Sequence, residues 1–440
     1  MKTKSFLLLT LFFIPICLLS QSFDREKMDQ LFDLLEASDR AMLSVSIFQN
    51  GQEVYARSVA YADLQDSIQA TAATVYRMGS ISKTYTATMI MQMVESGKIS
   101  LNTLLSDFFP AIPNSQQITI EMLLRHRSGI FNFTSDSNYV HYLHKPHSRE
   151  DILQIIQSFP PVFEPDSRLE YSNSNYVLLT FILEDLSGTE FSRVLNDQIT
   201  MPYSLENTYI VSEIKGNQPH AISYERKRNW EESTETHKSI PLGGGALSST
   251  PTEMNRFFHL LFSNQIVNAS SLEKMTTPLD RSGLGIFQFP FYEKISWGHT
   301  GGIDGFQAVA IYFPEDGIGV SIMSNAAATS LNDVLIGVMS IYLDRPYQMP
   351  EFQPFIFLEE EQLIQYHGTY SHPQFPLKIT VWNEENMLMA QASGQPAFAL
   401  DAQGDHVFTL DMAGLRLTFN PEEQSMLLQQ GGMEWLLTKE

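Results

Sequence analysis

The sequence is poor in cysteine and in positive charge. Its 440 residues include a single cysteine, Cys17, which excludes an internal disulfide and a cysteine-rich metal site. Only 28 lysines and arginines stand against 50 aspartates and glutamates, for a net charge of -22. Such a surface repels phosphate backbones and anionic lipids, so binding to nucleic acid is disfavoured. With 43% hydrophobic and 18% charged residues, the chain can bury a large core and is not disordered as a whole.

Long hydrophobic runs are absent after the first twenty residues. Lys2 and Lys4 precede an apolar stretch over 6–19, which is short for a membrane span. We interpret residues 1–20 as a signal peptide; an uncleaved membrane anchor and a lipid on Cys17 are the alternatives. The mature protein would then be exported to the periplasm or the extracellular space, with no stable membrane insertion after cleavage.

The patterning after the signal peptide predicts a large mixed domain followed by a small β-rich one. An amphipathic helix is expected over 24–38, and Asn50-Gly51 is a strong hairpin signal between two strands. A helix over 81–96 is apolar almost all round, which is typical of a buried helix. Strand character returns over 306–325, so both ends of this domain are expected to share one sheet. The predicted boundaries are 21–345 for the first domain, 346–365 for a proline-containing linker, and 366–440 for short strands of sandwich or barrel type.

Three short motifs carry candidate chemistry, and the first lies at the start of the buried helix. Ser80 and Lys83 are three residues apart and therefore share one helix face. A serine hydroxyl needs a base beside it, and a lysine serves as one only when burial and neighbouring charge keep its amine neutral. For an isolated pair, a capping serine and a surface lysine is the ordinary interpretation. The same spacing recurs at Ser212/Lys215 and Ser271/Lys274.

The second motif is Tyr171-Ser172-Asn173, which precedes another apolar helix. A tyrosine near a lysine could ionise and relay protons, and the asparagine amide could orient either a substrate carbonyl or Lys83. Taken alone, the motif is better explained by a helix-capping Ser/Asn cluster with a packing tyrosine.

The third motif places His299 and Thr300 before Gly301 and Gly302. Glycines let a backbone approach a ligand closely and present N–H groups to it. His299 and Thr300 would offer hydrogen bonds to a substrate carboxylate or to a reacting oxygen. A plain glycine-rich turn between strands is the alternative.

Motifs of several other enzyme classes are missing. There is no Gly-x-Ser-x-Gly elbow and no His-Glu-x-x-His, which disfavours an α/β-hydrolase and a zinc enzyme. A phosphate-binding loop and a dinucleotide fingerprint are missing as well. We therefore expect neither a metal nor a cofactor.

In this chain order, the three motifs together resemble those of penicillin-recognising serine hydrolases. That family includes class C β-lactamases, D-alanyl-D-alanine carboxypeptidases, and related esterases and D-amino-acid peptidases. The resemblance covers about residues 24–345. It implies an α+β fold, an α/β sandwich of the β-lactamase/transpeptidase type with a central antiparallel sheet and a helical subdomain. The stretch from His367 onward resembles the small lipocalin-like domain appended to some of these hydrolases.

The resemblance also implies a role for each motif residue. Ser80 would form the acyl-enzyme, while Lys83 and Tyr171 would share the proton transfers. The expected substrate-binding residues are Asn173, His299, Thr300 and Gly301, and the expected oxyanion-hole donors are the backbone N–H groups of Ser80 and Gly302. Dedicated β-lactamases and carboxypeptidases often have lysine at the position of His299, so this histidine favours the esterase and peptidase branch.

We therefore expect an exported serine hydrolase acting on amide or ester substrates, such as a D-amino-acid peptide, a peptidoglycan fragment, an ester or a β-lactam. Its partner would be a small-molecule or peptide substrate rather than nucleic acid. The alternative is a non-catalytic, penicillin-binding-like protein that binds cell-wall peptides or a protein partner.

Overall fold

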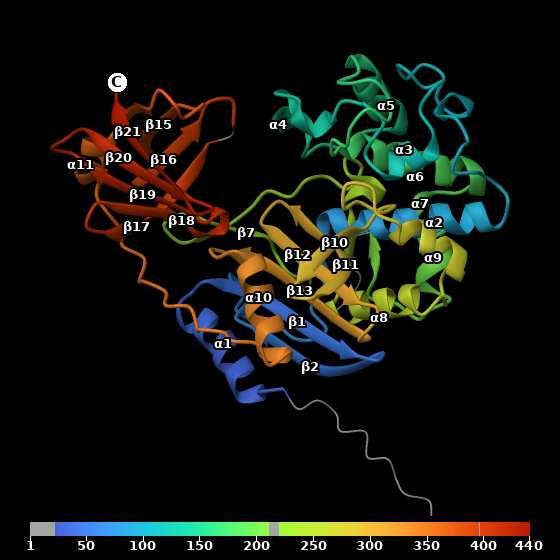
Figure 1. Cartoon of the computed structure of the whole chain (residues 1–440), viewed down its shortest axis with the longest axis horizontal. Coiled ribbons are helices and arrows are strands. Elements are labelled where there is room, and N and C mark those ends of the chain that lie inside the picture. The colour runs from blue at the N-terminus through green and yellow to red at the C-terminus, as the bar shows by residue number, and fades with distance from the viewer. Residues whose placement is uncertain (1–22, 211–219, 396) are drawn as a thin grey trace, which may run out of the picture.

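The structure, a computed structural model, describes residues 23–210, 220–395 and 397–440 (Figure 1). The predicted signal peptide over 1–20 lies outside these residues. Within the described ranges, no helix has both the length and the apolar character needed to cross a bilayer. The described chain forms a mixed domain of helices and sheet with an all-β barrel beside it (Figure 1). This arrangement confirms the predicted α+β class and the all-β C-terminal domain.

An antiparallel sheet forms the centre of the first domain, with the strand order β10-β11-β12-β13-β1-β2. Its strands are β1 (Ala41–Gln49), β2 (Gln52–Val59), β10 (Phe287–Phe291), β11 (Lys294–Ile303), β12 (Phe306–Phe313) and β13 (Ile318–Ala327). β1 pairs with β13, with Val45 opposite Ile322, so the two ends of the domain share one sheet as predicted. Asn50 and Gly51 turn between β1 and β2 with φ of 50° and 79°, which suits a two-residue hairpin.

Two helices, α1 (Arg25–Ala37) and α10 (Leu331–Tyr342), cover one face of this sheet (Figure 1). Asp24 caps α1 by accepting a hydrogen bond from the Lys27 backbone. The apolar stripe predicted for the first helix is confirmed, because its members are buried against the sheet and α10. They are Met28, Leu31, Phe32 and Leu35.

The opposite face carries a helical subdomain that positions the site. α2 (Ser82–Glu95) is buried over most of its length, as predicted, and packs with α6 (Asn173–Ser187) in one apolar core. Further helices are α3 (Ile120–Leu124), α4 (Tyr139–Tyr142), α5 (Arg149–Ser158), α7 (Phe191–Leu195), α8 (Pro251–Phe262) and α9 (Ala269–Thr276). Short strands lie before α2 and between α7 and α8, namely β3 (Tyr61–Asp63), β4 (Ile68–Gln69), β5 (Tyr76–Arg77), β6 (Tyr209–Ile210), β7 (Tyr224–Arg226), β8 (Trp230–Glu232) and β9 (Leu247–Ser249).

The C-terminal strands close into a barrel, which decides between the predicted sandwich and barrel. Neighbouring strands pair in chain order and β14 also pairs with β21. After α11 (Glu360–Leu363), the strands are β14 (Gly368–Ser371), β15 (Ile379–Glu384), β16 (Met387–Ala392), β17 (Phe398–Gly404), β18 (Val407–Leu410), β19 (Leu415–Asn420), β20 (Ser425–Gln430) and β21 (Met433–Lys439). Apolar side chains such as Leu388, Leu400 and Leu417 pack together in its core. The boundaries around the 346–365 linker remain predictions.

Candidate active site

Ser80 lies in a tight turn in front of α2. Residues Gly79–Ile81 form a single 3-10 turn, and α2 begins directly after it at Ser82. Gly79 has a φ of +53°, and a Cβ built on it would come 2.7 Å from the Gly302 backbone nitrogen. Glycine at this position therefore lets the turn rest against the backbone of β11. Ser80 itself stays partly exposed.

Lys83 is wholly buried one helical turn later, with its amine directed back at Ser80. Its Nζ lies 3.0 Å from Ser80 Oγ, 2.8 Å from Asn173 Oδ1 and 2.7 Å from the Gly244 carbonyl oxygen. Burial lowers the pKa of Lys83 to about 7, because no carboxylate among the described residues stands close enough to offset it. A large fraction of the amine is therefore neutral at neutral pH.

The contacts of Lys83 fit a neutral amine. Asn173 Nδ2 donates to Thr134 Oγ1 at 2.9 Å, which leaves Oδ1 as the atom that faces Lys83. Asn173 Oδ1 and the Gly244 carbonyl oxygen can only accept, so together they take both N–H groups of a neutral amine. The lone pair of the nitrogen then remains for the hydroxyl proton of Ser80. This geometry suits proton transfer from the serine to the lysine.

Tyr171 closes the other side of this cluster. Its ring stacks on His126 with centroids 4.2 Å apart, and its centroid lies 4.9 Å from Lys83 Nζ. The buried phenol oxygen forms no hydrogen bond with any described residue. Burial raises the pKa of Tyr171, and the nearby Ser80 hydroxyl offsets only part of that effect. The phenol therefore keeps its proton at neutral pH and is a proton donor rather than a phenolate base.

His299 is buried on β11 and neutral. Its Nδ1 donates to the Thr300 carbonyl oxygen, which can only accept. Burial, with a smaller contribution from the charge of Lys83, lowers the pKa of His299 to about 3. Its Nε2 is thus an acceptor, and it has no partner within the described ranges. This tautomer suits a hydrogen bond from a substrate N–H better than the expected donation to a substrate carboxylate.

Gly301 and Gly302 bring β11 against the serine turn. A Cβ on Gly301 would lie 2.0 Å from the Met78 carbonyl oxygen and 3.2 Å from the Ser80 backbone nitrogen, so only glycine allows this approach. Thr300 and Gly302 are exposed beside it. The structure thus gathers all the predicted site residues in one place, and their individual roles remain predictions. They are Ser80, Lys83, Tyr171, Asn173, His299, Thr300, Gly301 and Gly302.

One edge of β11 is open next to Ser80. β10 pairs with β11 only as far as Phe287 opposite Gly298. From His299 to Ile303, β11 pairs with β12 on one side and with no described strand on the other. An extended substrate can bind such an edge through main-chain hydrogen bonds.

A buried ion pair beside the site was not anticipated from the sequence. Arg77 Nη1 lies 2.7 Å from Asp304 Oδ2 and 3.3 Å from Glu235 Oε2. Arg77 precedes Ser80 by three residues and Asp304 follows Gly302 by two, so the pair ties the serine turn to β11. Arg77 lies close to the first motif in the sequence, but no sequence signal marked Asp304 as its partner.

Two further neighbours of the site stand in stretches that also resemble the family, but sequence reasoning gave neither a role. His126 accepts a hydrogen bond from the Ser172 backbone at 3.1 Å and supports the ring of Tyr171. The Gly244 carbonyl holds Lys83. His126 stands between two arginines that form ion pairs, a pattern typical of a surface turn, and only its burial distinguishes it.

The other Ser-x-x-Lys pairs differ from Ser80 and Lys83. Ser212 and Lys215 lie outside the described residues. In α9, Ser271 is buried but Lys274 is exposed, so this pair lacks the buried amine that Lys83 provides. Over residues 23–210, 220–395 and 397–440, no three or more His, Cys, Asp or Glu side chains gather where they could hold a metal ion.

Comparison with known proteins identifies the family of this chain. The family model described as beta-lactamase matches residues 28–336. The chain therefore belongs to the beta-lactamase family of serine hydrolases, which confirms the resemblance drawn from the three motifs.

Two curated relatives share part of the chain. The putative penicillin-binding protein PbpX of Bacillus subtilis (strain 168) is 26% identical over 251 residues, which cover 56% of this chain and 61% of that protein. The match thus spans less than two thirds of its length. The teichoic acid D-alanine hydrolase of Staphylococcus aureus is 25% identical over 282 residues, covering 61% of this chain and 67% of that protein.

Two solved structures share the fold. The D-amino acid amidase from Ochrobactrum anthropi SV3, complexed with L-phenylalanine amide, has a TM-score of 0.66 at 22% identity and covers 73% of this chain and 98% of the amidase. The octameric penicillin-binding protein homologue from Pyrococcus abyssi has a TM-score of 0.66 at 20% identity. That match covers 94% of this chain and 100% of the homologue, so it extends into the C-terminal barrel.

Proposed function

We propose that this protein is an exported hydrolase that cleaves amides or esters of D-amino acids through an acyl-enzyme on Ser80. The contact that carries the proposal is the 3.0 Å approach of Lys83 Nζ to Ser80 Oγ. Because two obligate acceptors occupy the N–H groups of the neutral amine, its lone pair is left for the serine proton. A neutral base beside a hydroxyl is what activates a serine nucleophile.

Acylation follows from these contacts. Ser80 Oγ adds to the substrate carbonyl carbon while its proton moves to Lys83. The scissile C–N or C–O bond then breaks, and the departing amine or alcohol takes a proton from the Tyr171 hydroxyl, which regains one from Lys83. The backbone N–H groups of Ser80 and Gly302 stabilise the negative carbonyl oxygen in between.

Deacylation uses the same groups in reverse. Water adds to the ester carbonyl and gives a proton to Lys83, and this proton returns to Ser80 Oγ as the ester bond breaks. The products are a carboxylic acid and an amine or alcohol, so water is the co-reactant. Asn173 orients Lys83, which is one of the two roles its motif suggested. His299, Thr300 and Gly301 bind the substrate along β11.

Two observations support D-amino-acid amides or esters as the substrate class. The open edge over His299–Ile303 suits the backbone of a peptide-like substrate. Among the similar proteins, one is a teichoic acid D-alanine hydrolase and another is a D-amino acid amidase. The signal-peptide pattern over 1–20 supports export to the periplasm or the extracellular space. We propose the layout 21–345, 346–365 and 366–440 for the mature chain.

The test uses three chromogenic or reactive probes: N-acetyl-D-alanine p-nitroanilide, its L-alanine counterpart, and a penicillin. We expect release of p-nitroaniline from the D-alanine compound, and a loss of about 10⁴-fold or more in Ser80→Ala. Intact-protein mass spectrometry should show an acyl adduct on the wild type and none on the variant.

Equal turnover by the wild type and Ser80→Ala would overturn the assignment of the nucleophile. Tight binding of the D-alanine compound without turnover or adduct would instead favour the alternative of a non-catalytic peptide-binding protein. Ser271→Ala is the matched control, since it removes a buried serine of the same sequence spacing away from the site.

A further inference from the structure

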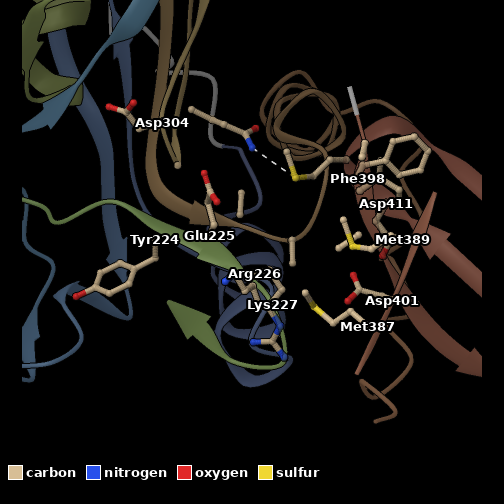
Figure 2. A pocket seen from close by; sticks show the side chains of 18 residues that line it. Tyr224, Glu225, Arg226, Lys227, Asp304, Met387, Met389, Phe398, Asp401 and Asp411 are labelled. Carbon is tan, nitrogen blue, oxygen red and sulfur yellow. Dashed lines mark hydrogen bonds between the residues drawn. The ribbon is translucent and has the colours of Figure 1, made fainter. Parts of the chain in front are cut away.

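A cavity of about 410 Å³ lies between the catalytic domain and the barrel (Figure 2). One wall belongs to β16 and β17 of the barrel, and the other to β7 and to the connection from β11 to β12. The side chains that matter below are Met387, Met389 and Asp401 on the barrel side, and Glu225 and Asp304 on the other side (Figure 2). The apolar core fills the interior of the barrel, so the cavity lies outside it.

The same hairpin borders both Ser80 and the cavity. The serine turn packs against β11 and β12. Gly302 on β11 is opposite Gln307 on β12, and Gln307 lines the cavity and donates to Met412 Sδ of the barrel at 3.7 Å. A substrate bound beside Gly302 therefore needs to extend only along the hairpin to reach the barrel.

The position of Tyr171 indicates the direction in which a substrate lies along β11. Tyr171, the proposed proton donor to the leaving group, lies beside His299, with ring centroids 6.4 Å apart. The leaving group thus faces His299, and the acyl chain runs the other way, past Gly302 towards Asp304. Gly302 and the cavity-lining Asp304 are two positions apart, and an extended chain advances about 3.3 Å per residue, so two substrate residues match this step. The residue before the scissile D-amino acid is therefore the one whose side chain enters the cavity.

Most charges on the cavity wall are already paired. The distances are 2.6 Å for Arg226 to Asp39, 3.2 Å for Lys227 to Glu385, 3.1 Å for Arg40 to Asp411 and 2.7 Å for Arg77 to Asp304. The Asp401 carboxylate differs, because it forms no hydrogen bond or ion pair with any described residue. Burial raises the pKa of Asp401 to about 6 despite Arg226 nearby, so at neutral pH an anion stands there without a direct partner.

Apolar groups surround this anion. Leu388 pairs with Leu400, which places Asp401 beside Met387 at the next step of the register. Met387 and Met389 alternate with buried Leu388 and therefore face away from the barrel core, towards the cavity. Thioether side chains adapt well to flexible aliphatic chains. Exposed Glu225 adds negative charge across the cavity.

We propose that this cavity is a substrate subsite for an aliphatic side chain that ends in an ammonium group, such as that of lysine or another diamino acid. The methylene groups pack on Met387 and Met389, and the ammonium donates to the Asp401 carboxylate. This inference rests on the proposed function for the direction of the acyl chain. It gives the barrel a part in choosing the substrate.

Two matched substrates test the subsite. N-acetyl-L-lysyl-D-alanine p-nitroanilide carries the ammonium, and the norleucine analogue has the same chain length without it. We expect the lysyl compound to have about a tenfold higher kcat/KM in the wild type. Asp401→Asn should abolish this preference and leave the norleucyl compound within about twofold. Met389→Ala should slow both long substrates and leave N-acetyl-D-alanine p-nitroanilide unchanged.

Two barrel variants outside the cavity serve as controls, and neither should change kcat/KM for any of these substrates. Asp405→Asn removes an exposed turn carboxylate, and Met433→Ala removes an exposed methionine on β21. Equal kcat/KM for the two long substrates, or a lysyl preference that survives in Asp401→Asn, would overturn the subsite.

A binding measurement separates this proposal from the proposed function. Calorimetry on Ser80→Ala with Nα-acetyl-lysine methylamide, against the norleucine counterpart, reports on the cavity without turnover. Tighter binding of the lysine compound, lost in the Ser80→Ala, Asp401→Asn double variant, supports the subsite even if no substrate is cleaved. Equal binding of both compounds contradicts it, even if short substrates are cleaved in a Ser80-dependent way.

Discussion

Lys83 and Asp401 are ionisable groups that form no direct ion pair with any described residue, but their surroundings differ. Lys83 lies inside one domain, fully buried, with three hydrogen-bond partners within 3.0 Å. The half-buried Asp401 carboxylate lines the cavity between the two domains and has no hydrogen-bond partner among the described residues. The first group is already oriented for chemistry, since its partners are in place before substrate arrives. The Asp401 carboxylate lacks a direct partner, and a cationic ligand can supply one.

The largest expected effect comes from replacing Lys83, the group that is already oriented. Lys83→Met removes the base but keeps the length of the side chain, so kcat on N-acetyl-D-alanine p-nitroanilide should fall by about 10³-fold. Circular dichroism should show an intact fold. Lys274→Met, in the exposed Ser-x-x-Lys pair of α9, is the control and should keep its full rate. A Lys83→Met enzyme with near-normal kcat would place the base elsewhere.

A smaller loss is expected when the groups around Ser80 remain but lose their alignment. Arg77→Met and Asp304→Asn each break the ion pair that ties the serine turn to β11. A displacement of about 1 Å at the reacting atoms can cost up to about 10²-fold, so kcat should fall by that order with little change in KM.

The control for this alignment is Arg149→Met, which removes a half-buried arginine on α5 that pairs with Asp185. Arg77→Lys should restore part of the rate, since it keeps the charge beside Asp304. A loss confined to KM in Arg77→Met would instead mean that the arginine serves binding alone.

The pH dependence of the short substrate sharpens the comparison further. A protonated Lys83 cannot accept the serine proton, so kcat/KM should fall about tenfold per pH unit below the lysine pKa of about 7 and level off above it. His299, with its pKa lowered to about 3, and Tyr171, with its pKa raised, do not titrate near pH 7. An acid limb near pH 4 would contradict a neutral lysine as the base.

The smallest effect is expected at the contact between the first domain and the barrel. Arg40 is 1% exposed, pairs with Asp411 at 3.1 Å, and its guanidinium carbon lies 4.1 Å from the Phe355 ring centroid. Arg40→Met should lower stability by about 1–3 kcal/mol. It should slow the lysyl substrate several-fold while sparing the short one.

Thermal unfolding and limited proteolysis within 346–365 measure the change in barrel docking. Arg168→Met, at an exposed ion pair with Glu170, should alter neither stability nor rate. If Arg40→Met slowed the short substrate as strongly as the lysyl one, the barrel would support the catalytic domain itself rather than the cavity.

The local parts of this protein were predictable from the sequence because they depend on short-range patterns. The stripe over Met28, Leu31, Phe32 and Leu35 requires only helical periodicity, and Asn50-Gly51 requires only turn chemistry. Ser80 and Lys83 stand on one helix face for the same reason. The joint order of three motifs then identified the family.

Contacts between distant segments were not predictable, because no pattern in one segment names its partner in another. The Gly244 carbonyl meets Lys83 across 161 residues of chain. Asp304 meets Arg77 across 227 residues. His126 supports Tyr171, although its neighbours in sequence look like a surface turn. The tautomer of His299 follows from its hydrogen bond to the Thr300 carbonyl, which the sequence cannot show.

The sequence by itself determined which groups we propose for the chemistry: a serine and a lysine on one buried helix, a tyrosine and an asparagine before another, and a histidine before two glycines. Tertiary structure decided what those groups can do. Burial without a counter-charge favours the neutral form of Lys83. Because β10 begins only at Phe287, opposite Gly298, the edge of β11 is open from His299 onward. The position of the barrel decided where the proposed subsite lies, because residues of both domains line the cavity that contains Asp401. Charge state and shape depend on everything that surrounds a residue, and those surroundings come from the whole chain.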